Sequence, residues 1–178
     1  MMNGIIIFKS KYGATKKYAE WLSEDLHFDC VEIKNINTQQ LMQYDTIILG
    51  GGIYASGIAG LSFLKKNIDK LSGKKIIVYC VGASPYEEEA FSEIYKYNFK
   101  DKLEGIKCFY YRGAWKENEM SFPDRTLCKM LQNVVAKKDP ATLAVWEKAL
   151  MSAVGQNCDW TDREYIKPVV EYVKGLAK

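Results

Sequence analysis

Short apolar runs alternate with amphipathic segments along most of this chain, and this alternation is the feature that most restricts its fold. The first run is apolar at every position from Ile5 to Phe8, as a strand buried on both faces requires. Between the runs, apolar residues recur every three or four positions, which predicts helices. Strands that alternate with helices indicate a doubly wound parallel α/β sheet with right-handed crossovers.

The spacing predicts one domain, residues 1–178, with five strands in the order 2-1-3-4-5. The strands are expected over 5–9, 29–33, 45–49, 75–81 and 106–111, and helices over 15–26, 61–71, 87–97, 123–135, 140–151 and 162–176. Pro168 falls inside the last helix, so we expect either a kink or a later start there. In such a sheet, ligands bind outside the carboxyl ends of the strands.

The turn after the first strand has the character of a phosphate site. It reads Ser10-Lys11-Tyr12-Gly13-Ala14-Thr15 and leads directly into a helix. A helix N-terminus presents backbone N–H groups and partial positive charge, and the hydroxyls of Ser10 and Thr15 can each donate to a phosphate oxygen. Gly13 permits a positive φ and a close approach of the backbone. The alternative is an ordinary turn in which Ser10 or Thr15 caps the helix.

Two further loops follow the third and fourth strands. The first contains Gly52-Ile53-Tyr54-Ala55 at the end of a triple glycine, and the second contains Gly82-Ala83-Ser84. Glycine backbone and an aromatic side chain suit a flat ring, which Tyr54 would stack on or flank. A tight corner and a proline-containing turn are the simpler alternatives for these two loops.

The segment from about 116 to 159 is far longer than a usual strand-to-helix connection. Its two expected helices make it a candidate lid or wall over the ligand loops. Trp115, which precedes it, is expected either near the ligand or as a hydrophobic anchor for the insert. The apolar residues of the insert helices, Met130 and Trp146 among them, are expected in the core, with contact to a membrane or an apolar substrate as the open alternative.

Composition narrows the class of protein further. Five cysteines without a CxxC pair and a single histidine argue against a disulfide framework, a zinc site or a histidine-based triad. The net charge of +3 is mild, and no charge block suggests a nucleic-acid partner. No leader segment or membrane-spanning run is recognisable, so we expect a cytoplasmic protein, with peripheral contact at the inner face of the membrane as an open alternative.

The three loops together resemble those of the flavodoxin family. Ser10 to Thr15 matches the family's hydroxyl-x-x-Gly-x-Thr phosphate loop, and the resemblance covers the chain to about residue 113 and the last helix. It implies a flavodoxin-like three-layer sandwich that binds FMN. The phosphate would lie at residues 10–15, with the isoalloxazine ring between the loops at 52–55 and 82–84.

Within that family the chain is most similar to the flavodoxin-type, menaquinone-dependent protoporphyrinogen oxidases. Gly113-Ala114, a long helical insert and Asp159-Trp160 carry this similarity. It implies an FMN-dependent oxidoreductase that oxidises a porphyrinogen and passes electrons to a quinone. The insert of those oxidases is rich in basic and aromatic residues. This chain differs, because residues 115–120, Trp-Lys-Glu-Asn-Glu-Met, contain two acidic side chains.

Three functions therefore remain open: an oxidoreductase acting on a small molecule or quinone, a flavodoxin-type electron carrier that docks a redox protein, and a flavin-binding sensor. No side chain is an evident catalytic acid or base, and the flavin would supply the redox chemistry. The sequence leaves the oligomeric state undetermined.

Overall fold

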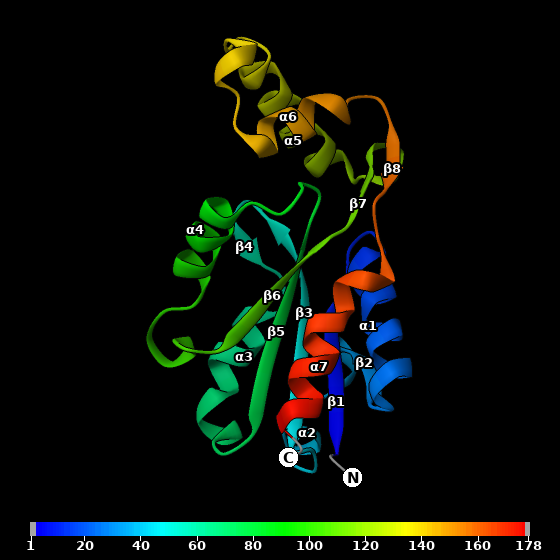
Figure 1. Ribbon diagram of the computed structural model, residues 1–178, viewed down its shortest axis with the longest axis vertical. Helices are drawn as coiled ribbons and strands as arrows, with labels where there is room; N and C mark the ends of the chain where they lie inside the picture. The colour runs from blue at the N-terminus through cyan, green and yellow to red at the C-terminus, as the bar shows by residue number, and fades with distance from the viewer. Residues whose placement is uncertain (1–2, 177–178) are drawn as a thin grey trace.

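The computed structural model describes residues 3–176 and has three layers, with helices on both faces of a central sheet (Figure 1). The parallel strands lie in the order β2-β1-β3-β5-β6. They are β1 (Gly4–Lys9), β2 (Asp29–Glu32), β3 (Thr46–Tyr54), β5 (Lys75–Gly82) and β6 (Lys107–Arg112). A two-residue strand, β4 (Gly57–Ile58), pairs antiparallel with the end of β3. Without β4 the order is 2-1-3-4-5, so the expected α/β fold class is confirmed.

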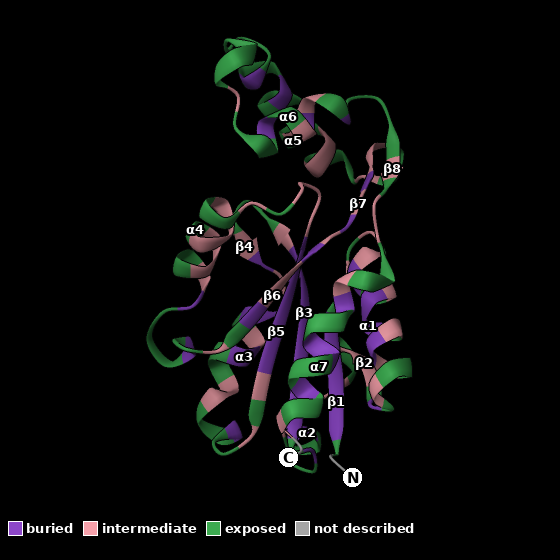
Figure 2. Ribbon diagram, viewed as in Figure 1, coloured by how far each residue is buried: buried purple, intermediate pink, exposed green. Residues whose placement is uncertain are grey.

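The register explains why the central strands are apolar without interruption. Ile6 of β1 aligns with Ile48 of β3, which aligns with Ile77 of β5, and this row faces one helical layer. The next row, which contains Ile7, Leu49 and Val78, faces the other layer. Both rows are buried, because a parallel sheet with helices on both faces leaves no face for water (Figure 2).

Helices α1 (Ala14–Leu26) and α7 (Lys167–Leu176) cover one face of the sheet. Helices α2 (Thr38–Leu41), α3 (Leu61–Asn67) and α4 (Glu88–Asn98) cover the other. A 3-10 turn over Arg163–Ile166 precedes α7, which starts late enough to place Pro168 in its first turn. The proline therefore marks a later helix start and no kink, because the first turn needs no N–H there.

The triple glycine corrects one prediction. We expected the third strand to end at Leu49, but β3 continues through Gly50, Gly51 and Gly52 to Tyr54. A Cβ on Gly50 would lie 2.1 Å from Cζ of Tyr79, and one on Gly51 would lie 2.1 Å from the Ala59 carbonyl oxygen. Close neighbours, and not a turn, therefore account for the first two glycines.

The segment between β6 and α7 lies beyond the carboxyl ends of the strands (Figure 1). It contains β7 (Ala114–Lys116), α5 (Phe122–Val135), α6 (Val145–Ser152) and β8 (Asn157–Asp159). The second insert helix starts later than expected, since Pro140–Thr142 form a separate 3-10 turn. The antiparallel β7–β8 pair was not predicted. Hereafter "the insert" means residues 114–159.

None of the helices within residues 3–176 combines the length and the apolar character that crossing a membrane requires.

Candidate functional site

The loops that follow β1, β3 and β5 meet the insert around one cavity of about 640 Å³. We call it the first cavity. Of the fourteen residues predicted to form the site, all except Lys11 and Gly13 line it: Ser10, Tyr12, Ala14, Thr15, Gly52, Ile53, Tyr54, Ala55, Gly82, Ala83, Ser84 and Trp115. The structure therefore brings the three predicted loops together. A cavity of this size is within the range that small-molecule and cofactor sites occupy.

The first turn has the backbone shape that its sequence predicts. Gly13 is the N-cap residue of α1 and has a φ of 94°, in the left-handed region that favours glycine. A Cβ at Gly13 would meet nothing within 4 Å, so the turn is open on that side. The Ser10 hydroxyl oxygen accepts from the Gly13 N–H at 3.1 Å, while Thr15 is almost fully buried. Neither side chain caps α1, contrary to the simpler alternative.

A buried tyrosine of the central sheet forms a hydrogen bond with the end of this turn. The Tyr79 hydroxyl donates to the Thr15 carbonyl oxygen at 2.9 Å, and both side chains are buried. Burial raises the pKa of Tyr79 well above its ordinary value, so the phenol stays protonated and remains a donor. The first residue of α1 to enter the core is thus tied to β5.

Lys11 and Tyr12 contact the insert. The Tyr12 hydroxyl and the Lys11 ammonium both contact the carboxylate of Asp124, in the first turn of α5. The hydrogen bonds from Lys11 and Tyr12 hold the pKa of Asp124 below its ordinary value. The backbone N–H of Ser121, the N-cap residue of α5, donates to the Tyr12 hydroxyl oxygen at 3.2 Å. The predicted phosphate turn is therefore joined to the insert by an ion pair.

Asp124 also lines the first cavity, and sequence reasoning did not identify it. Its place after Ser121 indicates only a helix start. Its contact with a turn more than a hundred positions earlier depends on how the insert folds back over the sheet, which no local pattern shows.

The loop after β3 is a tight reversal between β3 and β4. Ala55 and Ser56 have φ values of 45° and 67°, a left-handed conformation that side chains other than glycine adopt at a cost of about 1–3 kcal/mol each. Asn98 stabilises the reversal, donating to the Ser56 carbonyl oxygen at 2.7 Å and accepting from the Ile58 N–H at 2.9 Å. Tyr54 stands before the reversal, partly exposed, where it lines the first cavity.

The loop after β5 is fixed by its neighbour β6. The carbonyl oxygens of Gly82, Ala83 and Ser84 accept from the Gly113 N–H at 2.7 Å, the Arg112 Nε at 3.3 Å and the Tyr110 hydroxyl at 2.6 Å, respectively. Because three successive carbonyls are held, the loop presents a fixed backbone to the cavity. Tyr86, which follows it, is exposed and does not line the first cavity.

Trp115 is a hydrophobic anchor for the insert, as one of the two alternatives predicted. Its side chain is only 9% exposed and packs with Val135, Leu150 and Ala153 in the core of the insert. The same residue lines the first cavity. Arg112, by contrast, stacks on Trp160, with its guanidinium carbon 4.3 Å from the ring centroid.

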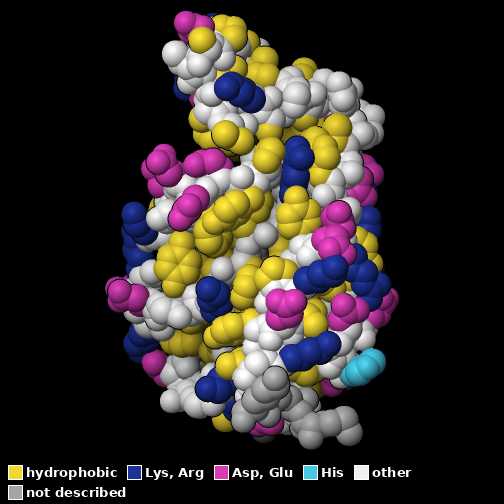
Figure 3. Space-filling model, in the orientation of Figure 1, with side chains coloured by type: hydrophobic (Ala, Val, Ile, Leu, Met, Phe, Trp, Pro, Cys, Tyr) yellow, Lys and Arg dark blue, Asp and Glu magenta, His cyan; other side chains and the backbone are white. Residues whose placement is uncertain are grey.

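The insert supplies an apolar wall to the first cavity. Met130 is 62% exposed and Trp146 39% exposed, so the expectation that they are core residues is wrong. Other large side chains that are exposed and line the cavity are Leu127, Leu131 and Val134. These residues recur on one face of α5, but periodicity alone could not distinguish a face packed in a core from a face that lines a cavity. Figure 3 shows hydrophobic side chains gathered where the insert meets the sheet.

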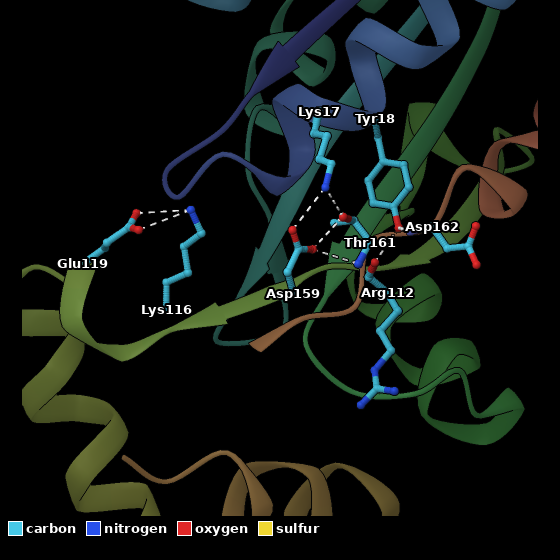
Figure 4. A network of polar contacts seen from close by, with 8 residues as sticks. All are labelled: Lys17, Tyr18, Arg112, Lys116, Glu119, Asp159, Thr161 and Asp162. Carbon is cyan, nitrogen blue, oxygen red and sulfur yellow. Dashed lines mark hydrogen bonds and ion pairs between the residues drawn. The ribbon is translucent and has the colours of Figure 1, made fainter. Parts of the chain in front are cut away.

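A polar network fixes the base of the insert (Figure 4). The Lys17 ammonium of α1 contacts Asp159 at 3.1 Å and the Thr161 hydroxyl at 2.7 Å. The Tyr18 hydroxyl donates to the Arg112 carbonyl oxygen at 2.5 Å and accepts from the Asp162 N–H at 3.1 Å. Both ends of the insert are thus attached to the helix that begins at the first turn.

Comparison with models of protein families gives a match over most of the chain. The sequence model of the flavodoxin domain family, Flavodoxin_5, matches residues 5–142. No curated protein sequence matches the chain.

Several solved structures are similar in fold. A flavodoxin from the domain Archaea is 13% identical, with a TM-score of 0.42, over 72% of this chain and 92% of that one. A flavodoxin, WrbA-like protein from Agrobacterium tumefaciens is 18% identical, with a TM-score of 0.45, over 70% and 88% of the two chains. Flavodoxin 2 from Bacillus cereus is 20% identical, with a TM-score of 0.41, over 66% and 90%.

Proposed function

Because this chain belongs to the flavodoxin domain family, we propose that it binds FMN in the first cavity and acts as an FMN-dependent oxidoreductase. The observation that carries the proposal is the meeting of three strand-end loops around one cavity whose remaining wall is an apolar insert. A phosphate turn and two ring-flanking loops are the parts that FMN needs, and the insert adds a place for a second molecule.

The residues present fit an FMN phosphate held largely by neutral donors. The turn at 10–15 is open beside Gly13, stands at the start of a thirteen-residue helix and has no acidic residue in the first turn of that helix. The Ser10 hydroxyl, which lines the cavity, would donate to the phosphate while its oxygen accepts from the Gly13 N–H. Asp124 is the only charged residue that lines the cavity within residues 3–176, and Lys11 neutralises it.

The flat part of the cofactor would lie between the loops at 52–55 and 82–84. Bound flavin supplies reversible one- or two-electron transfer. The chain's own part is to orient the ring, which Tyr54 would flank and the fixed backbone at Gly82 to Ser84 would border. Trp115 would close the cavity toward the insert core. We assign no catalytic acid or base.

The apolar wall favours a flat, poorly hydrated substrate. Exposed Leu, Met, Val and Trp side chains of α5 and α6 line the cavity, and an apolar ligand bound there would cover them from water. Oxidation of a porphyrinogen with a quinone as electron acceptor is the finer activity we propose. Its support is the long insert beside the ring-flanking loops. Peripheral contact of the insert with a membrane, through exposed residues such as Phe122, would bring the protein to a membrane quinone.

The second candidate is an electron carrier that docks a redox protein. Partial exposure of Tyr54 and exposure of Tyr86 favour it, because these side chains stand at the two ring-flanking loops and leave access from solvent. Reactions with a docking protein should slow steeply as ionic strength rises, whereas reaction with an uncharged small substrate should not.

Spectral titration with FMN tests the proposal. The protein should bind FMN with a shift of the visible flavin bands and should bind riboflavin, which lacks the phosphate, much more weakly. Two anaerobic experiments then test turnover: a porphyrinogen should reduce the oxidised FMN-loaded protein, and a quinone should reoxidise the photoreduced protein. Absence of FMN binding would refute the cofactor, and reoxidation no faster than in the buffer control would refute the oxidoreductase.

A further inference from the structure

A second cavity of about 660 Å³ adjoins the first. It is bounded by α4, by the loops after β3 and β5, and by the insert helices through Leu131, Val145 and Trp146. The two cavities share seven lining residues: Ile53, Ala55, Gly82, Ala83, Ser84, Leu131 and Trp146. The second cavity therefore meets the first at the loops that would flank the flavin ring.

Aromatic side chains gather along the second cavity. Phe91 and Tyr97 of α4, Tyr110 of β6 and Trp146 of α6 all line it. Phe91 and Tyr110 lie edge to face, with ring centroids 6.3 Å apart. Tyr97 is largely exposed at its opening. Several aromatic faces around one space suit a flat ring compound, because stacking adds to the gain from burial.

The charged side chains that line the second cavity within residues 3–176 are all acidic. Glu87 and Glu93 line it, and no Lys, Arg or His does so within the described part of the chain. Glu87 caps α4 by accepting from the N–H groups of Glu89 and Ala90, and Glu93 is exposed six residues further along the same helix. Figure 3 shows acidic side chains gathered over α4 near the insert.

Arg112 and Lys100 lie near residues of the second cavity but have contacts of their own. Arg112 donates to the Ala83 carbonyl oxygen and stacks on Trp160, and it lines neither cavity. The Lys100 ammonium lies 5.6 Å from the centroid of the Tyr97 ring, but Lys100 does not line the second cavity either. A ligand that carried a carboxylate would thus meet two carboxylates and no basic partner in the lining.

We propose that the second cavity binds a flat aromatic or quinone-type ring compound without negative charge. The inference rests on the proposed function in one respect, since it places this compound beside the FMN site. Of the two molecules named there, the cavity suits the quinone. A porphyrinogen, whose propionate groups are anionic, would be repelled by Glu87 and Glu93.

Isothermal titration calorimetry on the FMN-saturated protein tests this without turnover. The probes are 2-methyl-1,4-naphthoquinone, which is uncharged, and 1,4-naphthoquinone-2-sulfonate, which is anionic and similar in shape. The uncharged probe should bind more tightly. Glu93→Gln should reduce the ratio of the two affinities about two- to fivefold at low salt, because only the anionic probe should bind more tightly. Added salt should reduce this effect.

Two further variants complete the design. Glu88→Gln removes the same charge from α4 but at an exposed position that does not line the cavity, so it should leave the ratio unchanged. Tyr97→Ser, also at an exposed position, should weaken both probes. Each of three results would overturn the assignment: the sulfonate binds as tightly as the uncharged probe or more tightly, Glu93→Gln has no effect, or neither probe binds.

Failure of the proposed function gives a different result. If FMN does not bind, its own titration shows this, and the two probes are then compared on the protein without FMN. A preference for the uncharged probe that depends on Glu93 would support the second cavity even then, and its absence would overturn it.

Discussion

Two stacked tyrosines of the core offer a test in which one chemical change has opposite effects. Tyr79 and Tyr111 are at most 1% exposed, and their ring centroids lie 5.0 Å apart at an interplanar angle of 24°. The Tyr79 hydroxyl donates to the Thr15 carbonyl oxygen at 2.9 Å. The Tyr111 hydroxyl finds no partner within residues 3–176. Burial raises the pKa of both phenols well above the ordinary value, so both are neutral near pH 7.

Replacement by phenylalanine keeps each ring and removes only the hydroxyl. Tyr79→Phe loses a buried hydrogen bond, whose net contribution is about 0.5–1.5 kcal/mol, and should lower the free energy of unfolding by about 1 kcal/mol. Tyr111→Phe removes a buried hydroxyl that has given up its water without gaining a partner. Such a group costs about 1–3 kcal/mol, so this variant should be unchanged or up to about 1 kcal/mol more stable.

Urea denaturation of the two variants and the wild type measures the contrast. With an m-value of about 2 kcal/mol/M, the midpoint should fall by about 0.5 M for Tyr79→Phe and stay or rise for Tyr111→Phe, with m unchanged. Loss of stability in Tyr111→Phe as large as in Tyr79→Phe would refute the reasoning, because it would show that the Tyr111 hydroxyl has a partner in solution.

Three other substitutions probe the site and the sheet. Thr15→Ala should weaken FMN binding by roughly 1–2 kcal/mol and leave riboflavin binding unchanged, because one hydrogen bond to a charged oxygen is lost. Equal effects on both ligands in the spectral titration would show that the Thr15 hydroxyl does not bind the phosphate. Asp124→Asn removes a carboxylate from the cavity that would hold the phosphate, so it should strengthen FMN binding a few-fold at low salt without changing riboflavin binding. Weaker FMN binding would mean that the contact of Asp124 with the first turn matters more than the negative charge of Asp124. Gly50→Ala should destabilise the fold by about 1–3 kcal/mol through the clash with Tyr79, as measured by urea denaturation. Gly175→Ala, where a Cβ would meet nothing within 4 Å, is the matched control and should not destabilise the protein.

The loops that form the first cavity could be located from the sequence because their signals are local. An apolar run followed by a hydroxyl- and glycine-bearing turn defined the first strand, the positive φ at Gly13 and the start of α1 within one short segment. The same kind of local pattern placed residues 52–55 and 82–84 at the carboxyl ends of strands, where they line the first cavity, although residues 52–54 belong to β3 itself.

What the sequence did not show depends on contacts between distant segments. The strand that runs through Gly50 exists because Tyr79, on the neighbouring strand, needs the space where a side chain would be. Asp124 reaches Lys11 only because the insert folds back over the sheet. Met130 has the spacing of a core residue, and only its tertiary surroundings leave it facing a cavity.

The insert leaves and rejoins the sheet at a single point. The Trp160 N–H donates to the Gly113 carbonyl oxygen at 3.0 Å, so the chain returns beside the residue from which it departed. An excursion whose two ends are neighbours can be lengthened, shortened or exchanged while the strands beneath it keep their register. The wall that the insert adds to the two cavities can consequently be exchanged, in evolution or by engineering, as a separate module above an unaltered sheet.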